Sequence, residues 1–245
     1  GVWCGAWRRL CGPAVRIDVV IIRPTPHVTR PSPEPLHGIA VLERGWLSSN
    51  NVLVHAVDDE PGALLVDTSH VNHAAQTLAL VQHALAGQPL ALIANTHLHS
   101  DHCGGNATMQ RAFGAPLALP PGQADAVSRW DEQVLSYQRT GQRIEPFRHQ
   151  QLLQPGQSLR AGGRDWEVLA APGHDPHAVM LFDRACGVLL SADALWGNGF
   201  GVIFPELEGE SGFDEQGSVL DLIATLDGDT VIPGHGPMFG DVGAA

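Results

Sequence analysis

The sequence predicts an α/β sandwich. Three observations support this prediction: short apolar segments separated by turns, amphipathic segments with helical spacing, and repetition of this order in both halves of the chain. Two β-rich halves, each followed by helices, indicate packed sheets with helices outside them. With 245 residues, 44% of them apolar, the chain can bury a substantial core.

The first 38 residues differ from the rest. Residues 17–22 are apolar enough for a strand, but five prolines follow between positions 24 and 35. Proline lacks an amide hydrogen and is disfavoured in helices and central strands. We therefore expect residues 1–38 to form an extended, proline-rich arm and residues 39–245 to form one folded domain.

This domain begins with a predicted hairpin and helix. Residues 51–57 and 63–66 are apolar segments separated by the turn-forming residues 58–62. Residues 73–86 place apolar side chains at helical spacing and are followed by a glycine and a proline.

The rest of the first half is organised around a polar, glycine-containing loop at residues 95–106. Residues 90–94 and 116–119 predict strands, and residues 107–113 predict a helix. Residues 123–140 predict a longer amphipathic helix. Two aromatic side chains of that helix are candidates for one wall of a substrate pocket: Trp130 and Tyr137.

The second half repeats this pattern. Residues 197–217 are rich in glycine and aromatic residues and predict a long loop, and residues 218–226 predict a helix. The predicted strands are residues 166–170, 179–182, 188–190 and 230–232.

The charge distribution excludes several functions. The net charge is −12, and all 14 basic residues are arginines. Without lysine, Schiff-base chemistry and P-loop phosphate binding are excluded. A chain this acidic is poorly suited to nucleic acid, and no apolar run reaches the length of a membrane span, so we expect neither partner. The 13 histidines are a first indication of metal chemistry.

The four cysteines are too dispersed for a disulfide scaffold. No signal peptide is evident, because charged residues interrupt the apolar stretch near the start. We therefore expect a reducing, cytoplasmic setting. Nothing in the sequence predicts an oligomeric state.

The most informative segment follows the predicted strand at residues 90–94. It contains four side chains that commonly bind metals within six positions: His97, His99, Asp101 and His102. The spacing of His97 and His99 places them on one face of an extended chain. The glycines at 104 and 105 then allow a tight turn.

Three more such side chains each follow a later predicted strand. His174 lies in a Pro-Gly-His-Asp segment, Asp193 follows a serine and an alanine, and His235 lies between two glycines. Strand ends that converge at one sheet edge form sites in α/β proteins. Five histidines and two aspartates suffice for two divalent cations.

The string His97-Leu98-His99-Ser100-Asp101-His102, with His174, Asp193 and His235 at these separations, resembles the metallo-β-lactamase-fold hydrolase superfamily. The resemblance covers roughly residues 39–240. It implies an αββα sandwich of two mixed β-sheets flanked by helices, a catalytic domain with a dinuclear metal site at the edge between the sheets.

The resemblance also implies the role of each ligand. Asp67 would support the metal-binding loop, although Ser69 stands where family members often have glycine. The implied ligands are His97, His99 and His174 for the first metal, Asp101, His102 and His235 for the second, and Asp193 as the bridge.

The implied function is hydrolysis. Two Zn²⁺ ions, or iron or manganese in their place, would share a hydroxide that attacks the carbonyl of a small ester, thioester, lactone or related acyl substrate. Asp101 is the candidate catalytic residue, because it can orient that hydroxide or carry a proton.

Asp193 also bears on the branch of the superfamily. Clinical β-lactamases of this fold mostly have cysteine or serine near this position, so the aspartate favours a thioesterase-, lactonase- or glyoxalase II-like hydrolase. Glyoxalase II carries a C-terminal helical domain, which we do not expect here because ten residues follow His235.

Three alternatives remain open. The same ligands would suit a mono-iron oxidoreductase similar to sulfur dioxygenases, a β-lactam-hydrolysing member of the fold, or a metal-storing protein without turnover. An intact ligand set with open metal positions weighs against the last of these.

Residues outside the ligand set have weaker signals. The aromatic segment after Asp193 predicts an apolar substrate wall, and His177 predicts a side chain that orients a ligand from outside the metal site. The residues predicted for the wall are Trp196, Asn198, Phe200 and Phe204.

Overall fold

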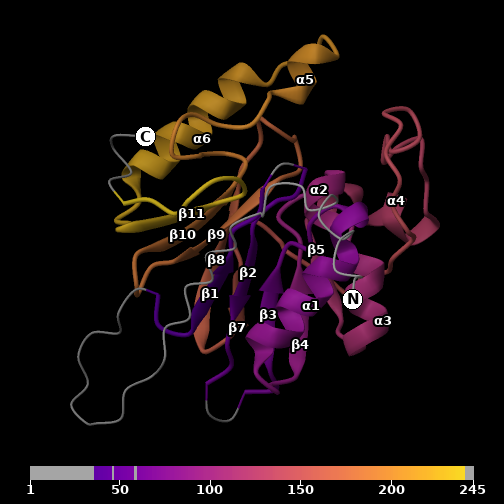
Figure 1. The fold of residues 1–245 in the computed structure, drawn as a ribbon. Coiled ribbons are helices and arrows are strands. Elements are labelled where there is room, and N and C mark those ends of the chain that lie inside the picture. The colour runs from indigo at the N-terminus through magenta and orange to yellow at the C-terminus, as the bar shows by residue number, and fades with distance from the viewer. Residues whose placement is uncertain (1–35, 46, 58–59, 241–245) are drawn as a thin grey trace, which may run out of the picture.

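The computed structural model describes residues 36–45, 47–57 and 60–240. Two β-sheets lie face to face, and helices cover their outer faces (Figure 1). This confirms the αββα sandwich. Most of the predicted arm, its strand at residues 17–22, Cys4 and Cys11 lie outside the described residues.

The first sheet contains six strands in the order β1-β2-β3-β4-β5-β6. They are β1 (Ile39–Leu42), β2 (Asn51–Val54), β3 (Ala63–Val66), β4 (Leu90–Ala94), β5 (Leu117–Leu119) and β6 (Gln151–Leu152). The first three are antiparallel, as the predicted hairpin requires, and β3 to β6 are parallel. The ends of β3 and β4 therefore lie at one edge, directly before Asp67 and the histidine-rich loop.

The second sheet has the order β11-β10-β9-β8-β7. Its strands are β7 (Ser158–Ala161), β8 (Arg164–Ala170), β9 (Val179–Asp183), β10 (Val188–Ala192) and β11 (Thr230–Pro233). β10 and β11 are parallel, and β9 is antiparallel to both β8 and β10. The ends of β8, β10 and β11 consequently lie at the same edge, before His174, Asp193 and His235.

Alternating side chains connect the layers. In β2 and β3, Leu53 and Leu65 point toward the helices on the first sheet, whereas Val54 and Leu64 face the second sheet. Those helices are α1 (Ala74–Leu85), α2 (Ser100–Cys103), α3 (Asn106–Phe113) and α4 (Ala124–Arg129), while α5 (Phe204–Leu207) and α6 (Phe213–Thr225) lie between β10 and β11 in the chain.

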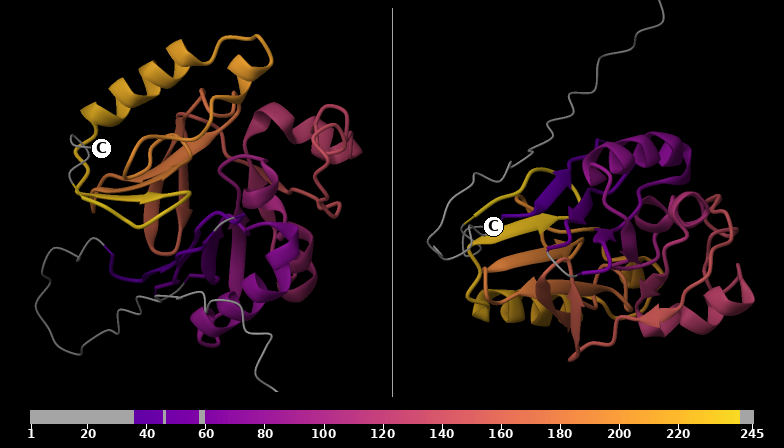
Figure 2. Two further views of the ribbon diagram at one scale, coloured as in Figure 1. Left: turned by 45° about the horizontal axis from the view of Figure 1, so that its top comes forward. Right: turned by 90° about the horizontal axis from the view of Figure 1, so that it is seen from below.

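α6 packs on the outer face of the second sheet, with Val219 and Ile223 buried in the same cluster as Phe182. The two further views show α6 and the helices of the first sheet on opposite sides of the sandwich (Figure 2). Among the described residues, no helix is both long and apolar enough to cross a membrane.

Three expectations about helices are wrong. The predicted helix at residues 123–140 ends at Arg129, because Trp130 adopts a left-handed conformation (φ 51°) and the amide of Asp131 donates to Ala126 O, as in a Schellman motif. The loop predicted at residues 95–106 contains the short helix α2.

The third concerns the loop predicted at residues 197–217, which contains α5 and the first turn of α6. The Glu206 carboxylate accepts the amides of Gly212 and Phe213, so it caps α6 from a distant position in the sequence. β1, β6 and β7 were not predicted. β6 is exposed and β7 is only partly buried, so neither has a strongly apolar pattern.

Tyr137 lies after α4 and is buried in the core. Its hydroxyl donates to Leu98 O at 2.9 Å, within the histidine-rich loop. Trp130 also packs against this core. The two aromatic residues therefore support the loop from behind and do not form a substrate wall.

Tyr137→Phe should fold but lower the free energy of unfolding by about 1–2 kcal/mol, because the buried Leu98 carbonyl loses its hydroxyl donor and keeps only the weaker Cys103 thiol. Chemical denaturation would measure this. Ser218→Ala, which removes an exposed hydroxyl from α6, is the control and should change stability by less than about 0.5 kcal/mol. Equal effects of the two variants would show that the tyrosine hydroxyl does not support the loop.

Candidate metal centre

The seven predicted ligands come together at the edge where the strands of both sheets end. Four follow β4, and the others follow β8, β10 and β11. Three sets of ligand atoms each lie within 4.8 Å of one another: His97, His99 and His174; His97, His102 and Asp193; and Asp101, His102 and His235.

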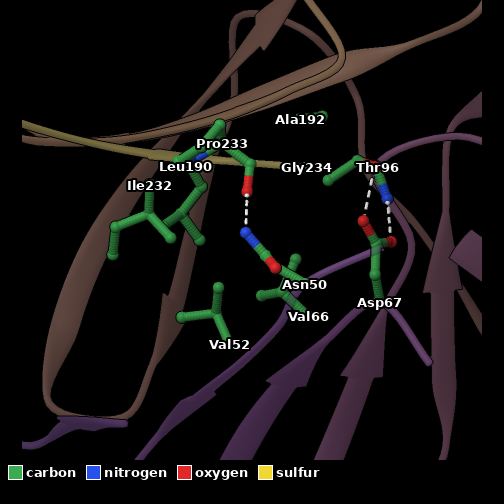
Figure 3. A pocket seen from close by; sticks show the side chains of 10 residues that line it. All are labelled: Asn50, Val52, Val66, Asp67, Thr96, Leu190, Ala192, Ile232, Pro233 and Gly234. Atoms are coloured by element: carbon green, nitrogen blue, oxygen red, sulfur yellow. Dashed lines mark hydrogen bonds between the residues drawn. The ribbon is translucent and has the colours of Figure 1, made fainter. Parts of the chain in front are cut away.

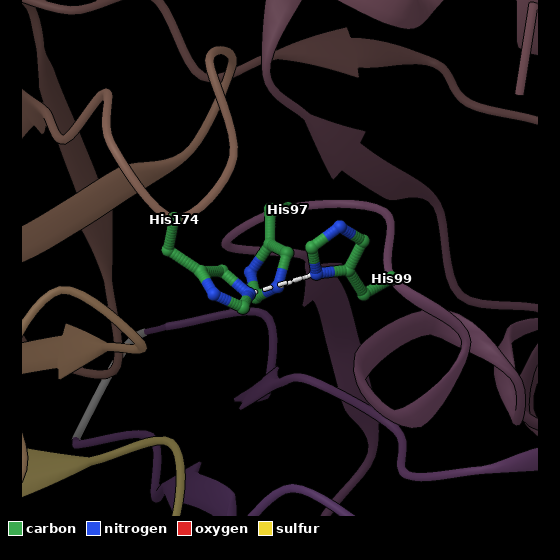
Figure 4. Close-up of side chains that lie close together, drawn as sticks. All are labelled: His97, His99 and His174. Atoms are coloured by element: carbon green, nitrogen blue, oxygen red, sulfur yellow. Dashed lines mark hydrogen bonds between the residues drawn. The ribbon is translucent and has the colours of Figure 1, made fainter. Parts of the chain in front are cut away.

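The first set is formed by three imidazoles. His97 Nε2 lies 3.1 Å from His99 Nδ1, which lies 2.8 Å from His174 Nε2. Figure 4 shows the three rings turned toward a common point. The ligand nitrogens of tetrahedral zinc are separated by about 3.3 Å, given Zn–N bonds of about 2.0–2.1 Å. The three nitrogens therefore fit one face of such a site with only a small expansion.

The set of Asp101, His102 and His235, here called the second set, contains two imidazoles and a carboxylate. His235 Nε2 lies 3.1 Å from Asp101 Oδ2, and His102 Nε2 lies 3.9 Å from the same oxygen.

Asp193 lies between the two sets. Its Oδ1 is 3.3 Å from His102 Nε2, and its Oδ2 is 3.3 Å from His174 Nε2 and 3.7 Å from His235 Nε2. One carboxylate thus faces histidines of both sets, the position that a bridging ligand requires.

Asp67 orients two of these histidines. Its Oδ2 contacts His102 Nδ1 at 2.7 Å and accepts the Thr96 hydroxyl at 2.8 Å. Because Thr96 donates its only hydroxyl hydrogen there, its oxygen accepts from His97 Nδ1 at 3.1 Å. Nδ1 therefore carries the hydrogen in both rings, and the Nε2 lone pairs point into the centre.

The remaining histidines of the first set are oriented in the same way. His174 Nδ1 donates to Val202 O at 2.7 Å. His99 Nε2 lies 3.6 Å from Asp175 Oδ2, a longer contact. In each case the other ring nitrogen faces the centre.

His102 Nε2 provides an independent test of whether a cation fits. This atom is buried and has no hydrogen-bond partner among the described residues. Such an orphaned nitrogen is costly in a folded protein. A cation bound to its lone pair would satisfy it, so the donor set fits a divalent metal.

The electrostatics of the centre also favour cations. Burial, with repulsion from neighbouring imidazoles, lowers the pKa of His97 well below its usual value and that of His174 to about 4. Burial disfavours a charged His102, but Asp193 and two further carboxylates outweigh it and raise its pKa. Burial likewise opposes ionisation of Asp193, yet the facing histidines lower its pKa to about 2.

The backbone around the centre is constrained. Asp67 and Ser69 both have left-handed conformations, with φ of 58° and 66°. Glycine adopts this conformation without strain, which explains why it suits position 69. Here the Ser69 hydroxyl donates to Asn51 Oδ1 at 2.8 Å and accepts from Arg44 Nη1 at 3.2 Å. These contacts hold the serine in place. At Gly105, a Cβ atom would lie 2.3 Å from Thr68 O.

The predicted wall residues have different environments. The Phe204 ring lies against His99 and His174, with centroids 4.8 and 5.4 Å apart. Trp196 donates its Nε1 hydrogen to Asp193 Oδ1 at 3.3 Å, and its ring packs on His235. It therefore contacts the centre itself. Asn198 and Phe200 are exposed, and no hydrogen bond or ring contact joins them to the predicted ligands in the described structure.

His177 is exposed, and its imidazole lies over Gly122. Its side chain makes no hydrogen bond to the predicted ligands in the described part of the chain, so the observed contacts do not support the orienting role predicted for it. Asp175, two residues earlier, contacts His99 instead. The sequence contained one signal for Asp175, because this carboxylate directly follows the predicted ligand His174. It contained no signal for the Val202 carbonyl, which accepts from His174.

Residues 44–235 match the metallo-beta-lactamase superfamily. The chain belongs to this superfamily. The resemblance noted from the histidine-rich string is therefore confirmed.

Two curated relatives illustrate the similarity. Human acyl-coenzyme A thioesterase MBLAC2 is 30% identical over 173 residues, covering 63% of this chain and 59% of the relative. A hydroxyacylglutathione hydrolase from Gloeobacter violaceus is 31% identical over 158 residues, covering 64% and 54%. The chain thus spans between half and three-fifths of the length of these relatives.

Solved structures agree on the fold. The BLEG-1 B3 metallo-beta-lactamase has a TM-score of 0.67 and 24% identity, with 84% of this chain and 95% of that chain covered. TTHA1623 in a di-iron-bound form has a TM-score of 0.65 and 26% identity, with 83% and 95% covered.

Asp67→Asn should weaken metal binding by about 10–100-fold, because an amide cannot accept the Thr96 amide, the Thr96 hydroxyl and His102 Nδ1 together. Titration of the metal-free protein with Zn²⁺ against a chromophoric chelator would measure the affinity. Asp221→Asn, an exposed change on α6, should leave it unchanged. Unaltered affinity in Asp67→Asn would contradict the orienting role.

Proposed function

We propose that the protein is a metal-dependent hydrolase that uses two divalent cations to cleave acyl compounds, with thioesters as the preferred class. The observation that supports this most strongly is that the outward nitrogens of His97, His102 and His174 are engaged by neighbours while the inward ones converge. When bound, two such cations activate water and polarise a carbonyl oxygen.

The chain's own residues would hold these cations and orient the attacking water. With cations bound, the histidines would offer unprotonated ring nitrogens, and Asp101 and Asp193 would supply negative charge. Asp193 would fix the separation of the two sets because its oxygens face both. Asp101 is partly exposed and its Oδ2 lies beside His235. This position suits it to orient a water molecule or to hold a proton at that oxygen.

The similar proteins support an acyl substrate. Their names describe an acyl-coenzyme A thioesterase and a hydroxyacylglutathione hydrolase. The similar structure TTHA1623 is in a di-iron-bound form, so this fold can hold iron. We propose zinc for this chain because its ligands are mostly imidazoles, with iron as the alternative.

The surroundings of the centre favour an apolar acyl group. Phe204 contacts two predicted ligands and is 44% exposed, while Val202 and Leu207 nearby in the sequence are 55% and 71% exposed. An acyl chain that covered such side chains would gain about 25 cal/mol per Å² of apolar surface removed from water.

A panel of chromogenic substrates tests the proposal. Metal-loaded protein would be assayed with a thioester, a simple ester, a lactone and a cephalosporin, with and without chelator. The proposal expects chelator-sensitive turnover that is fastest with the thioester. Turnover confined to the cephalosporin, or equal turnover after metal removal, would contradict it.

Asp193→Ala should retain its fold and lose more activity than the roughly 10–100-fold typical of residues that only orient ligands. The reason is that the two oxygens of Asp193 face histidines of both sets, His102 and His174. Kinetics with the best substrate, together with a circular dichroism spectrum, would measure this. Asp214→Asn on the exposed start of α6 is the control. Full turnover by the Asp193 variant would refute the bridging role.

Phe204→Ala and Trp196→Phe should have different kinetic effects. Loss of the Phe204 ring should raise KM about tenfold for long-chain acyl substrates and leave acetyl substrates nearly unchanged. Trp196→Phe removes the donor to Asp193 and should lower kcat for both substrates. Steady-state kinetics with a long-chain and an acetyl thioester would show this, and identical profiles for the two variants would contradict it.

A further inference from the structure

Asn50 connects the first sheet to the loop that carries His235. It directly precedes β2 and is only 3% exposed. Its side-chain amide donates both hydrogens to this loop, one to Pro233 O at 3.0 Å and one to Gly236 O at 2.8 Å. The first of these bonds is drawn in Figure 3, beside a cavity of about 10 Å³ between the sheets.

The orientation of this amide is fixed. Asn50 Oδ1 accepts the backbone amide of Arg44 at 2.9 Å, so the NH₂ group must face the carbonyls on either side of His235. The backbone amide of Asn50 donates to Gly234 O at 2.7 Å. Three hydrogen bonds from one residue therefore reach residues 233–236.

Ser49, the preceding residue, makes a hydrogen bond to the backbone of Asp101, another predicted ligand of the second set. The amide of Ser49 donates to Asp101 O at 3.0 Å. The adjacent residues Ser49 and Asn50 thus bind the backbone of the two segments that carry Asp101 and His235. The side chains of these two predicted ligands approach each other to 3.1 Å, between His235 Nε2 and Asp101 Oδ2.

The His235 loop needs such a constraint. His235 lies between two glycines, and Gly236 has φ of 81°. A Cβ atom at Gly234 would lie 2.1 Å from Asp193 Oδ1, so this position must remain glycine. Two glycines leave the backbone with little rigidity of its own. External hydrogen bonds therefore have to define where His235 points.

We propose that Asn50 is a positioning residue that holds His235 against Asp101 and so completes the second cation set. This inference rests on the two-cation centre of the proposed function. The first set, His97, His99 and His174, has no hydrogen bond from Asn50 among the described residues. Loss of Asn50 should therefore affect the two sets unequally.

The test is a calorimetric titration of the metal-free full chain with Co²⁺, followed by absorption spectra of the loaded protein. Wild type should bind two equivalents. Asn50→Ala should bind the first with an affinity within about twofold of wild type and the second about 10–100-fold more weakly. Its spectrum at one equivalent should match that of wild type at one equivalent.

Gln88→Ala is the matched control. The Gln88 side-chain amide also pairs with backbone, since its Nε2 donates to Ala56 O and its Oε1 accepts the amide of Ala56, but these contacts lie away from the predicted ligands. This variant should keep both equivalents even if its stability falls. If Asn50→Ala does not fold, Asn50→Ser, which leaves one hydroxyl donor, allows the same comparison with a smaller loss.

The outcomes separate the two proposals. The positioning role would be overturned if the Asn50 variant bound both Co²⁺ equivalents with wild-type affinity. It would also be overturned if the variant bound both equivalents more weakly by the same factor. A wild-type protein that binds no second equivalent would instead refute the two-cation centre on which the inference rests.

Discussion

The carboxylate of Asp67 determines the geometry of the centre more than any other group outside the predicted ligands. It accepts the Thr96 amide at 2.9 Å, the Thr96 hydroxyl at 2.8 Å and His102 Nδ1 at 2.7 Å. Through Thr96 it also fixes the hydrogen of His97. One buried side chain at the end of β3 thereby orients two histidines after β4. This is possible because the two strands are parallel and end side by side.

The same arrangement has a cost in the metal-free protein. His97, His102, His174 and Asp193 are all buried within a few ångströms of one another, and His102 Nε2 has no hydrogen-bond partner in the described structure. Buried charges and unsatisfied polar atoms oppose folding unless they are compensated. Cations bound to the native state would supply that compensation and add to stability by mass action. Asp67, Ser69 and Ala192 also have left-handed conformations, so part of the backbone strain of the fold lies at this edge.

Much of the fold could be predicted from the sequence where an element is buried on both faces. The bounds of β3 and β4 coincide with their apolar runs, because all but one of their positions are buried. β6 and β7 lie at sheet edges and lack that pattern. The end of α4 and the start of α6 depend on a Schellman turn and on a cap from Glu206, and helical spacing does not report either feature.

The candidate site also combines residues that the sequence identifies with residues that only the tertiary structure identifies. The predicted ligands were identifiable because four lie in one short string and the others follow strands. The groups that orient them were identified less completely: Asp67 came from the family resemblance, whereas Asp175 and Asn50 were not assigned roles. Their effect depends on which loops meet at the sheet edge, a property of the tertiary structure. His177 was a plausible choice by sequence proximity, but its ring points toward Gly122.

The central claim is that this edge of the sandwich holds two cations in a shared His and Asp cluster. Anomalous diffraction from a crystal of the metal-loaded protein tests it most directly. The account predicts two peaks, one about 2.0–2.1 Å from ring nitrogens of His97, His99 and His174 and one beside Asp101, His102 and His235, with Asp193 contacting both. A single peak, or peaks bound by other residues, would contradict it.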